Sequence, residues 1–422
     1  MIDLERLTDD GSLELRTEDA PANARPATAA LHRERVHAAG AQAARPLPRL
    51  AVDLMGLSTS LPEHVLTQDD AIARAKRLFP AYADATSIFT NAGITARRSV
   101  MPADWHNSAH SWSDRAALFD SAGHDLAETT ARKVLAASGL APGDIDGVVT
   151  VCTTGISVPG LDVTLCNRLG LAPSVQRLPL FGLGCAGGVS GLARAAHLAS
   201  ADPGANILVV CVELCSINFR SDDKSKANFV SSALFADGAA GFVLRARPTG
   251  DDAATPASPT MGVQATVRFC GEHLWPKSEY AMGWAVEDDG LGVVISTDIP
   301  TLARRQLRPA VEAFLSRCSV SRDDLAGLIF HPGGARVLDA IADALECPAD
   351  HLLHARTVLA DYGNMSSPTA LFVLERTLAS RATGRHLLGA FGPGFTASFA
   401  ILDLPGAATH REPTGATDGQ DI

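Results

Sequence analysis

Two stretches of this chain, one starting at Leu50 and one at Met261, repeat a similar order of strand-like and helix-like segments. In the first stretch, strand-like runs at Leu50–Ser58 and Ile145–Val151 flank a segment with helical apolar spacing at Ser121–Ser138. Strands that alternate with helices in this way predict an α/β fold built of packed layers.

The remaining segments follow the same alternation. In the first stretch they are a helix at Val158–Leu169, a small-residue helix ending near Ser200 and a strand at Asn206–Val212. In the second they are a strand at Met261–Phe269, helix Thr301–Arg317, strand Leu325–Phe330, helix Gly334–Leu345, helix Ser367–Ser380 and strands His386–Phe391 and Ala397–Asp403. This order predicts a distant duplication, with one half over residues 50–245 and the other over 261–405.

Three segments lack a sustained apolar period. Residues 1–49 are predicted to be a flexible extension, with a short docked helix around Leu31–Ala43 as the alternative. Residues 246–260, rich in Pro, Asp, Ala and Thr, are predicted to be a connector between the halves. Residues 406–422 are predicted to be a flexible tail.

Charge and cysteine usage exclude several classes of protein. The 36 basic and 47 acidic residues give a net charge of −11, which disfavours nucleic acid or an anionic membrane as the main partner. Apolar runs such as Ile207–Val212 are much shorter than the about 18 residues of a membrane span. The eight cysteines contain no CxxC pair and no metal-ligand spacing, so we expect a cytoplasmic protein without a zinc site.

One cysteine has the surroundings of a nucleophile. Cys185 lies between glycines in Phe181-Gly-Leu-Gly-Cys185-Ala-Gly-Gly188, directly before the helix-like Val189–Leu198. A helix N-terminus favours a thiolate, and the glycines permit a sharp turn that exposes sulfur to a substrate carbonyl. The alternative is an ordinary small buried cysteine.

A histidine and an asparagine occupy positions from which they could assist such a cysteine. His331 follows the strand Leu325–Phe330, and parallel strands of α/β sheets present ligand sites at their carboxyl ends. Asn364 lies in a loop before a helix and could stabilise an oxyanion. The alternatives are a structural histidine and a turn or capping asparagine.

Cysteine, histidine and asparagine in this order permit acyl transfer or peptide hydrolysis of the papain type. The cysteine neighbourhood typical of papain-like enzymes is absent. The motifs together resemble those of chalcone synthase-like type III polyketide synthases, over about Leu50 to Leu404. The matching segments are Gly-Cys185-Ala-Gly-Gly, His331-Pro-Gly-Gly, Gly363-Asn364-Met-Ser-Ser, Phe391-Gly-Pro-Gly394, Val210-Cys-Val-Glu213 and Ala233-Leu-Phe235-Ala-Asp-Gly238.

The resemblance implies a duplicated thiolase fold of αβαβα layers and a decarboxylative Claisen condensation. Cys185 would carry the acyl starter from an acyl-CoA, with His331 as its imidazolium partner. His331 and Asn364 would stabilise the enolate formed from malonyl-CoA. Phe235 matches the family's gatekeeper position. No permanent cofactor or metal is implied.

Other positions differ from the plant enzymes and imply a reshaped pocket. Asn218 replaces a threonine of the starter pocket, Trp284 a small glycine and Val293 a second gatekeeper phenylalanine. Further pocket residues implied by the resemblance are Cys152, Thr153, Cys215 and Ser366. The indole of Trp284 would close one lobe, while Val293, Cys152, Thr153 and Cys215 would open another. Cys152-Thr-Thr-Gly-Ile156 and the arm Arg97–Arg115 resemble bacterial alkylresorcinol and alkylpyrone synthases, which predicts such a product.

The resemblance also implies a homodimer, with Val158 reaching the neighbouring cavity. The basic residues that hold coenzyme A in the plant enzymes are not matched, because Arg97 and Arg98 do not align with them, so an acyl carrier protein could deliver the starter. The main alternative is a ketoacyl synthase III-type enzyme that condenses once in fatty-acid initiation. A degradative thiolase would need a second cysteine beyond Asn364, and a scaffold protein would have lost one of the three residues.

Overall fold

The computed structural model describes residues 46–247 and 262–405. The predicted tail, nearly all of the predicted connector and the docked-helix alternative lie outside these residues. Leu47, near the end of the predicted flexible extension, is held in place, because its backbone N donates to the Arg317 carbonyl at 2.9 Å.

A mixed sheet of nine strands forms the centre of the described residues. Strands β4 and β11 end beside the candidate site, and each runs parallel to at least one neighbour. The spatial order of the strands is β11 (Gly327–Phe330), β12 (Gly384–Gly392), β13 (Thr396–Leu404), β8 (Val263–Leu274), β1 (Val52–Ser60), β7 (Asp237–Ala246), β6 (Asn206–Leu214), β4 (Gly147–Val151) and β5 (Gln176–Leu180).

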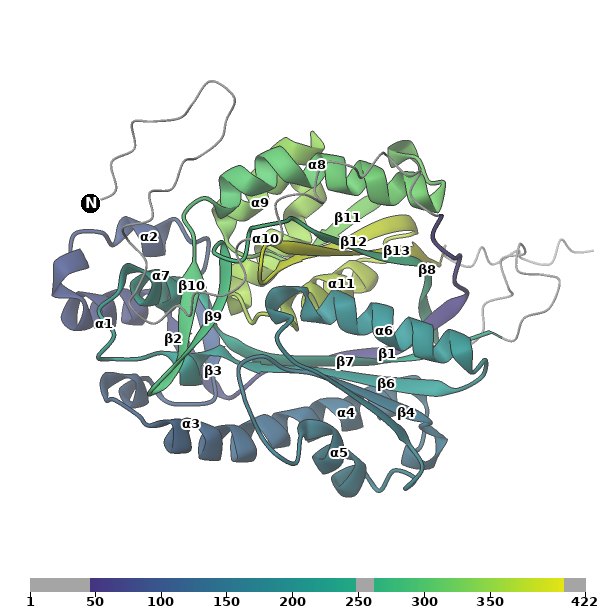
Figure 1. Cartoon of the computed structure of the whole chain (residues 1–422), viewed down its shortest axis with the longest axis horizontal. Helices are drawn as coiled ribbons and strands as arrows, with labels where there is room; N and C mark the ends of the chain where they lie inside the picture. The colour runs from purple at the N-terminus through teal and green to yellow at the C-terminus, as the bar shows by residue number, and fades with distance from the viewer. Residues whose placement is uncertain (1–45, 248–261, 406–422) are drawn as a thin grey trace, which may run out of the picture. The chain divides into compact units, whose positions relative to one another are not determined.

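Helices cover both halves of this sheet and also lie between them (Figure 1). Helices α4 (His124–Ser138) and α5 (Leu161–Leu169) pack on the half that contains β6, and α8 (Ile299–Cys318) packs on β8 and on α9 (Ala335–Leu345). The middle layer consists of α6 (Gly187–Ala201) and α11 (Thr369–Ala379), which contact strands of both halves. The two halves of the sheet lie on either side of α6 and α11, and the other helices cover their outer faces. The result is five alternating layers of helix and sheet.

The order of elements occurs twice, which is the duplication that the sequence predicted. In the first half it runs β1, α4, β4, α5, β5, α6, β6, β7, and in the second β8, α8, β11, α9, α11, β12, β13, with helix α10 (Leu353–Tyr362) where the first half has strand β5. The middle helices are rich in small or apolar residues because both of their faces are covered.

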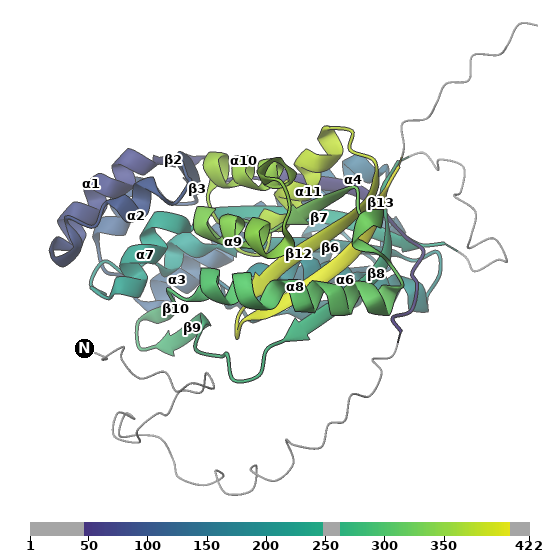
Figure 2. The same ribbon diagram turned by 90° about the horizontal axis from the view of Figure 1, so that it is seen from above.

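Several short elements gather at one end of the sheet (Figure 2). They were not predicted. The strands and one helix among them have only four to six residues and carry little periodicity, whereas the other three helices have 7 to 11 residues. They are the strand pairs β2 (His64–Thr67) with β3 (Ala96–Ser99) and β9 (Met282–Glu287) with β10 (Gly290–Ile295), the helices α1 (Gln68–Leu78), α2 (Ser87–Thr90) and α3 (Trp112–Leu118), and helix α7 (Lys226–Leu234).

Most predicted elements differ from the observed ones by a few residues at their ends. The largest shift concerns the strand expected at Met261–Phe269, which is observed over Val263–Leu274. The helix expected at Val158–Leu169 begins at Leu161, after Pro159 and Gly160, since a residue before proline is disfavoured in a helix. The helix expected to begin at Ser121 starts as a π-helical turn, Phe119–Gly123. Within residues 46–247 and 262–405, no helix has the length and apolarity that crossing a bilayer requires.

Candidate active site

Cys185 lies in a short 3-10 turn, Gly184–Ala186, that leads into α6, as the sequence predicted. Its neighbours are glycines because three loops meet here. A Cβ on Gly184, whose φ is +46°, would lie 2.7 Å from Pro393 Cγ, and one on Gly188 would lie 2.4 Å from the Ser367 carbonyl oxygen. The Cys185 loop therefore packs directly against the Phe-Gly-Pro-Gly loop and the loop that carries Asn364.

His331 follows the last residue of β11, and its backbone N donates to the Gly389 carbonyl at 2.9 Å. The side chain is only 3% exposed, and neither ring nitrogen has a hydrogen-bond partner among the described residues. Burial lowers the pKa of His331 to about 3. A buried imidazole with both nitrogens free is prepared to bond a group that is not part of the chain.

Asn364 lies beside Cys185, and its amide is oriented by the backbone. Cys185 Sγ is 3.9 Å from Asn364 Oδ1, which also accepts from the Ser366 backbone N at 2.8 Å. Asn364 Nδ2 donates to the Gly333 carbonyl at 3.3 Å. Ser366 adopts a left-handed φ of +58°, which turns the chain sharply after the asparagine.

Cys185 is not the thiolate that the sequence predicted, because its surroundings raise its pKa. Burial raises the pKa of Cys185 to about 11, and the charge of Glu213 raises it further, while hydrogen bonds with Ser366 and Asn364 oppose the shift. Desolvation outweighs the helix N-terminus here because the thiol is only 9% exposed. In the absence of a charge on the other group, burial keeps both the Cys185 thiol and the His331 imidazole neutral.

Glu213 is a residue at the site to which the sequence assigned no role. Its buried carboxylate accepts from Thr153 N at 3.0 Å, Thr154 N at 2.9 Å, Thr154 Oγ1 at 2.7 Å and Ser367 Oγ at 2.8 Å. Burial raises the pKa of Glu213, and these hydrogen bonds oppose the shift. The carboxylate thus ties the loop after β4 to the loop that carries Asn364. The sequence pointed to Glu213 only as the last residue of Val210-Cys-Val-Glu213, a segment that matches the family.

A cavity of about 760 Å³ lies in front of these residues. Cys185, His331 and Asn364 all line it, so the structure brings the three together in one wall. Residues of the wall that the sequence also singled out are Phe235, Trp284, Val293 and Ser366. Trp284 and Val293 are direct partners across β9 and β10, and the Trp284 ring lies 6.0 Å from that of Phe235.

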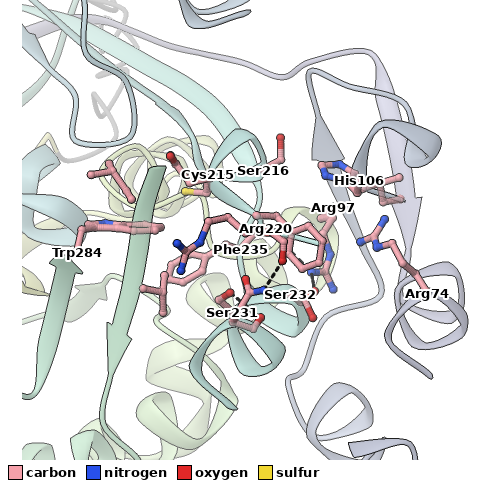
Figure 3. A pocket seen from close by; sticks show the side chains of 16 residues that line it. Arg74, Arg97, His106, Cys215, Ser216, Arg220, Ser231, Ser232, Phe235 and Trp284 are labelled. Carbon is pink, nitrogen blue, oxygen red and sulfur yellow. Dashed lines mark hydrogen bonds between the residues drawn. The ribbon is translucent and has the colours of Figure 1, made fainter. Parts of the chain in front are cut away.

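The other predicted pocket residues divide into two groups. Cys215 and Asn218 line a second, small cavity behind Phe235, which also borders on Trp284 and Val293 (Figure 3). Cys152 and Thr153 line neither of these cavities, contrary to expectation. They pack toward Glu213, and Thr153 Oγ1 accepts from Gly184 N at 3.0 Å. They therefore support the Cys185 loop from behind and do not open a lobe.

Val158 lies outside both cavities with 94% of its surface exposed. Arg97 is buried, and Arg98 bonds to the carbonyls of Pro62 and Glu63, so neither faces the large cavity. The part of the chain that the structure describes contains no cluster of three potential metal ligands. All eight cysteines are free thiols.

Comparisons with known proteins agree with this arrangement. Residues 99–248 match the N-terminal domain of chalcone and stilbene synthases, and residues 266–403 match the C-terminal domain of the same enzymes. The 1,3,6,8-tetrahydroxynaphthalene synthase of Streptomyces peucetius is 36% identical over 82% of this chain and 91% of its own length. The chain belongs to the chalcone and stilbene synthase family.

Two further type III polyketide synthases support this assignment. An α-pyrone synthesis polyketide synthase-like protein of Mycobacterium tuberculosis is 28% identical over 87% of this chain and 95% of its own length. The crystal structure of the 1,3,6,8-tetrahydroxynaphthalene synthase of Streptomyces coelicolor superposes with a TM-score of 0.78 and 27% identity, covering 84% of this chain and all of that one. The five layers are therefore the duplicated thiolase fold. This type III polyketide synthase is a condensing acyltransferase that acts on coenzyme A thioesters.

Proposed function

We propose that Cys185, His331 and Asn364 are the catalytic residues of this polyketide synthase. The observation that carries the proposal is their meeting in the wall of one cavity, with Cys185 Sγ 3.9 Å from Asn364 Oδ1. In the loading step Cys185 sulfur attacks the carbonyl carbon of an acyl-CoA, the bond to coenzyme A sulfur breaks, and the acyl group remains on Cys185 as a thioester. His331 accepts the thiol proton, because the thiol alone is held neutral by burial, and passes it to the leaving coenzyme A sulfur.

In the extension step, malonyl-CoA loses CO₂, and the electron pair of the broken bond becomes an enolate on the thioester. The free ring nitrogens of His331 and the weakly held amide of Asn364 are suited to donate to that enolate oxygen. The enolate carbon then attacks the Cys185 thioester, forms a carbon–carbon bond and releases the cysteine sulfur. Phe235 keeps the entry to this space apolar, which disfavours a charged carboxylate and favours its loss.

We propose an alkylpyrone or alkylresorcinol as the product. The cavity of about 760 Å³ offers room for a long acyl chain, and its wall carries many apolar side chains, including Ile88, Val230, Leu234, Met282 and Ile295. Cyclisation after several extensions would release the product from Cys185. The name of the mycobacterial relative, which refers to α-pyrone synthesis, agrees with this proposal.

We propose that the substrates reach the cavity as coenzyme A thioesters. Two exposed cations, Lys226 and Arg336, line the wall along which they would enter. Cations of this kind favour the phosphates of coenzyme A. The alternative is a starter bound to an acyl carrier protein.

A cytoplasmic homodimer is proposed as the working form. An exposed valine such as Val158 gains from burial in an interface, and its place beside the Cys152 loop suits a contact with a second copy. We propose that the chain divides into one half over residues 50–245 and another over residues 261–405, joined by residues 246–260.

The proposal is tested by incubating the purified protein with malonyl-CoA and acyl-CoA starters from acetyl to palmitoyl. We expect multiply extended pyrones or resorcinols by mass spectrometry, and no thioester adduct on intact Cys185→Ala. Single-extension β-ketoacyl thioesters would instead support the ketoacyl synthase III-type alternative. A thioester found on another cysteine would overturn the assignment of the nucleophile.

A further inference from the structure

The small cavity behind Phe235 gathers two buried arginines and a buried histidine, whose pKa burial lowers to about 3, so that the imidazole is neutral. Its free space is about 40 Å³, and the shared residues Phe235, Trp284 and Val293 separate it from the large cavity. Arg74 and His106 lie at the end farthest from Trp284, and Arg97 lies between them and Phe235 (Figure 3).

None of these three side chains forms an ion pair with a carboxylate among the described residues. Arg97 donates only to neutral oxygens, which are the Gln68 side-chain oxygen and the carbonyls of Ser232, Ala233 and Phe235. Its Nε has no partner in the described part of the chain.

Arg74 and His106 are similarly unsatisfied. Within residues 46–247 and 262–405, Arg74 makes no hydrogen bond or ion pair, and its guanidinium carbon lies 5.8 Å from the centre of the Phe219 ring. The Nδ1 atom of His106 also has no partner there, and the side chain is only 2% exposed. Arg74 is 9% exposed and Arg97 is 3% exposed, so all three are at least nine-tenths buried.

Nearby acidic groups neutralise this cluster only in part, because the charge of Asp70, one turn earlier on α1, acts on Arg74 without forming an ion pair. The third arginine of the cavity wall, Arg220, already binds Asp223 at 2.9 Å, Glu287 at 2.5 Å and Asp289 at 2.7 Å. Asp237, behind the wall, accepts from Ser216 and from the backbone of Val100. Burial, together with the charge of Arg74, lowers the pKa of Arg97 to about 9.

A structural explanation accounts for part of this cluster only. Arg97 binds carbonyls at the end of α7 and so stabilises the C-terminus of that helix. This role does not explain why Arg74 has no hydrogen-bond or ion-pair partner among the described residues. It also does not explain why His106 Nδ1 and Arg97 Nε have no hydrogen-bond partner there. Buried cations are costly without a counter-charge, and unpaired buried donors indicate a missing ion or water.

We propose that the small cavity binds a carboxylate-sized anion through Arg74, Arg97 and His106. The free space of about 40 Å³ exceeds the about 10–15 Å³ that one water-sized group needs, so the cavity suits an anion of carboxylate size and not a phosphorylated cofactor. The same chemistry has two sources: the terminal carboxylate of a thioester substrate, or free bicarbonate. The first source rests on the proposed function.

The carboxylate that malonyl-CoA loses is not suited to this cavity. Cations that bind the carboxylate stabilise the ground state more than the transition state, and so slow its loss as CO₂. The cavity therefore fits a carboxylate that is retained through the reaction. Phe235 and Trp284 lie between the two cavities, so the carboxylate of a starter on Cys185 reaches the arginines only when these two side chains turn aside.

The first test measures binding without turnover. We would titrate the full-length protein with sodium acetate, and separately with bicarbonate, against chloride at equal ionic strength, and follow binding by calorimetry and by the melting temperature. We expect saturable binding by at least one of the two anions. Binding should be at least about tenfold weaker in Arg74→Gln, since a charge-assisted hydrogen bond to the anion is lost.

The matched control is Arg77→Gln, because Arg77 lies on the same helix, is exposed and bonds to Asn107 outside the cavity. It should bind the anions as the parent does. If Arg74→Gln fails to fold, His106→Phe, which keeps a ring beside Trp105 and Phe219, serves instead. No saturable binding to the parent, or unchanged binding in the folded variants, would overturn the proposal.

A second experiment distinguishes the two sources by comparing succinyl-CoA with butyryl-CoA as starters. A preference of about tenfold or more for succinyl-CoA that disappears in Arg74→Gln identifies the substrate carboxylate. No preference, with anion binding retained, identifies the free anion. If no starter is extended at all, the proposed function fails, while the binding titration still decides whether the anion site exists.

Discussion

The backbones of Phe235 and Asn364 are joined by an isolated parallel β-bridge. The hydrogen bonds on either side run from Asn364 N to the Leu234 carbonyl at 2.9 Å and from Ala236 N to the Asn364 carbonyl at 2.8 Å. The gatekeeper position comes from the first half of the duplicated fold and the asparagine from the second. Movement of either loop therefore shifts both the cavity wall and the proposed oxyanion donor.

Trp284→Gly is expected to change product length more than it changes malonyl decarboxylation. The indole lies in the wall between the two cavities, 6.0 Å from the Phe235 ring, so its removal joins them. Product masses and CO₂ release would be measured together. Val286→Ala, at an exposed position of the same strand, is the control. An unchanged product distribution would contradict a role for Trp284 in limiting the cavity.

His331→Gln is expected to make Cys185 react with iodoacetamide only under strongly alkaline conditions. Burial holds the pKa of the isolated thiol at about 11, and a raised thiol pKa leaves less thiolate at neutral pH. In the parent, a proton passed to His331 would provide a positive charge that lowers this value. Each unit of pKa changes the thiolate fraction about tenfold at a pH below both values.

The measurement is the rate of Cys185 alkylation between pH 6 and 11, followed on the Cys185 peptide by mass spectrometry. The half-buried Cys166 and Cys347 provide internal controls, because they lie outside the cavity. Identical pH profiles for the parent and for His331→Gln would show that the imidazole does not activate the thiol.

Glu213→Gln is expected to destabilise the fold by about 2–3 kcal/mol, because charge-assisted hydrogen bonds from Thr153, Thr154 and Ser367 lose the carboxylate. It should also speed alkylation of Cys185, since the charge of Glu213 raises the pKa of that thiol. Urea unfolding and alkylation rates would test both effects.

Glu375→Gln is the control for Glu213→Gln, because its side chain accepts one hydrogen bond, from Thr59 at 2.9 Å, and does not line the large cavity. A Glu213 variant with parental stability would show that the network does not hold the two loops together.

Gly188→Ala is expected to destabilise the protein by about 1–3 kcal/mol and to slow condensation. The new Cβ would lie 2.4 Å from the Ser367 carbonyl oxygen, a backbone atom of the loop that carries Asn364. The control is Gly143→Ala, where an added Cβ meets nothing within 4 Å. The melting temperature and the rate of product formation would be measured for both variants. If Gly188→Ala behaves like Gly143→Ala, the Cys185 loop is not closely packed against the Ser367 backbone.

The sequence by itself determined the layered α/β class, the repeated order of elements and the three proposed catalytic positions. Buried runs such as Ile145–Val151 and Asn206–Val212 carry a local pattern that predicts strands. Cys185, His331 and Asn364 lie in short motifs whose glycines and turns are local properties of the chain. These features follow from neighbouring residues, so they are readable without coordinates.

Only the tertiary structure decided how the site is bounded and charged. The opposition of Trp284 and Val293, the withdrawal of Cys152 and Thr153 from the cavity and the high pKa of Cys185 all depend on packing. The small cationic cavity unites Arg74, Arg97 and His106 with a wall more than a hundred residues away in the chain. Burial and Coulomb interactions depend on distances in space, which no local pattern of residues specifies.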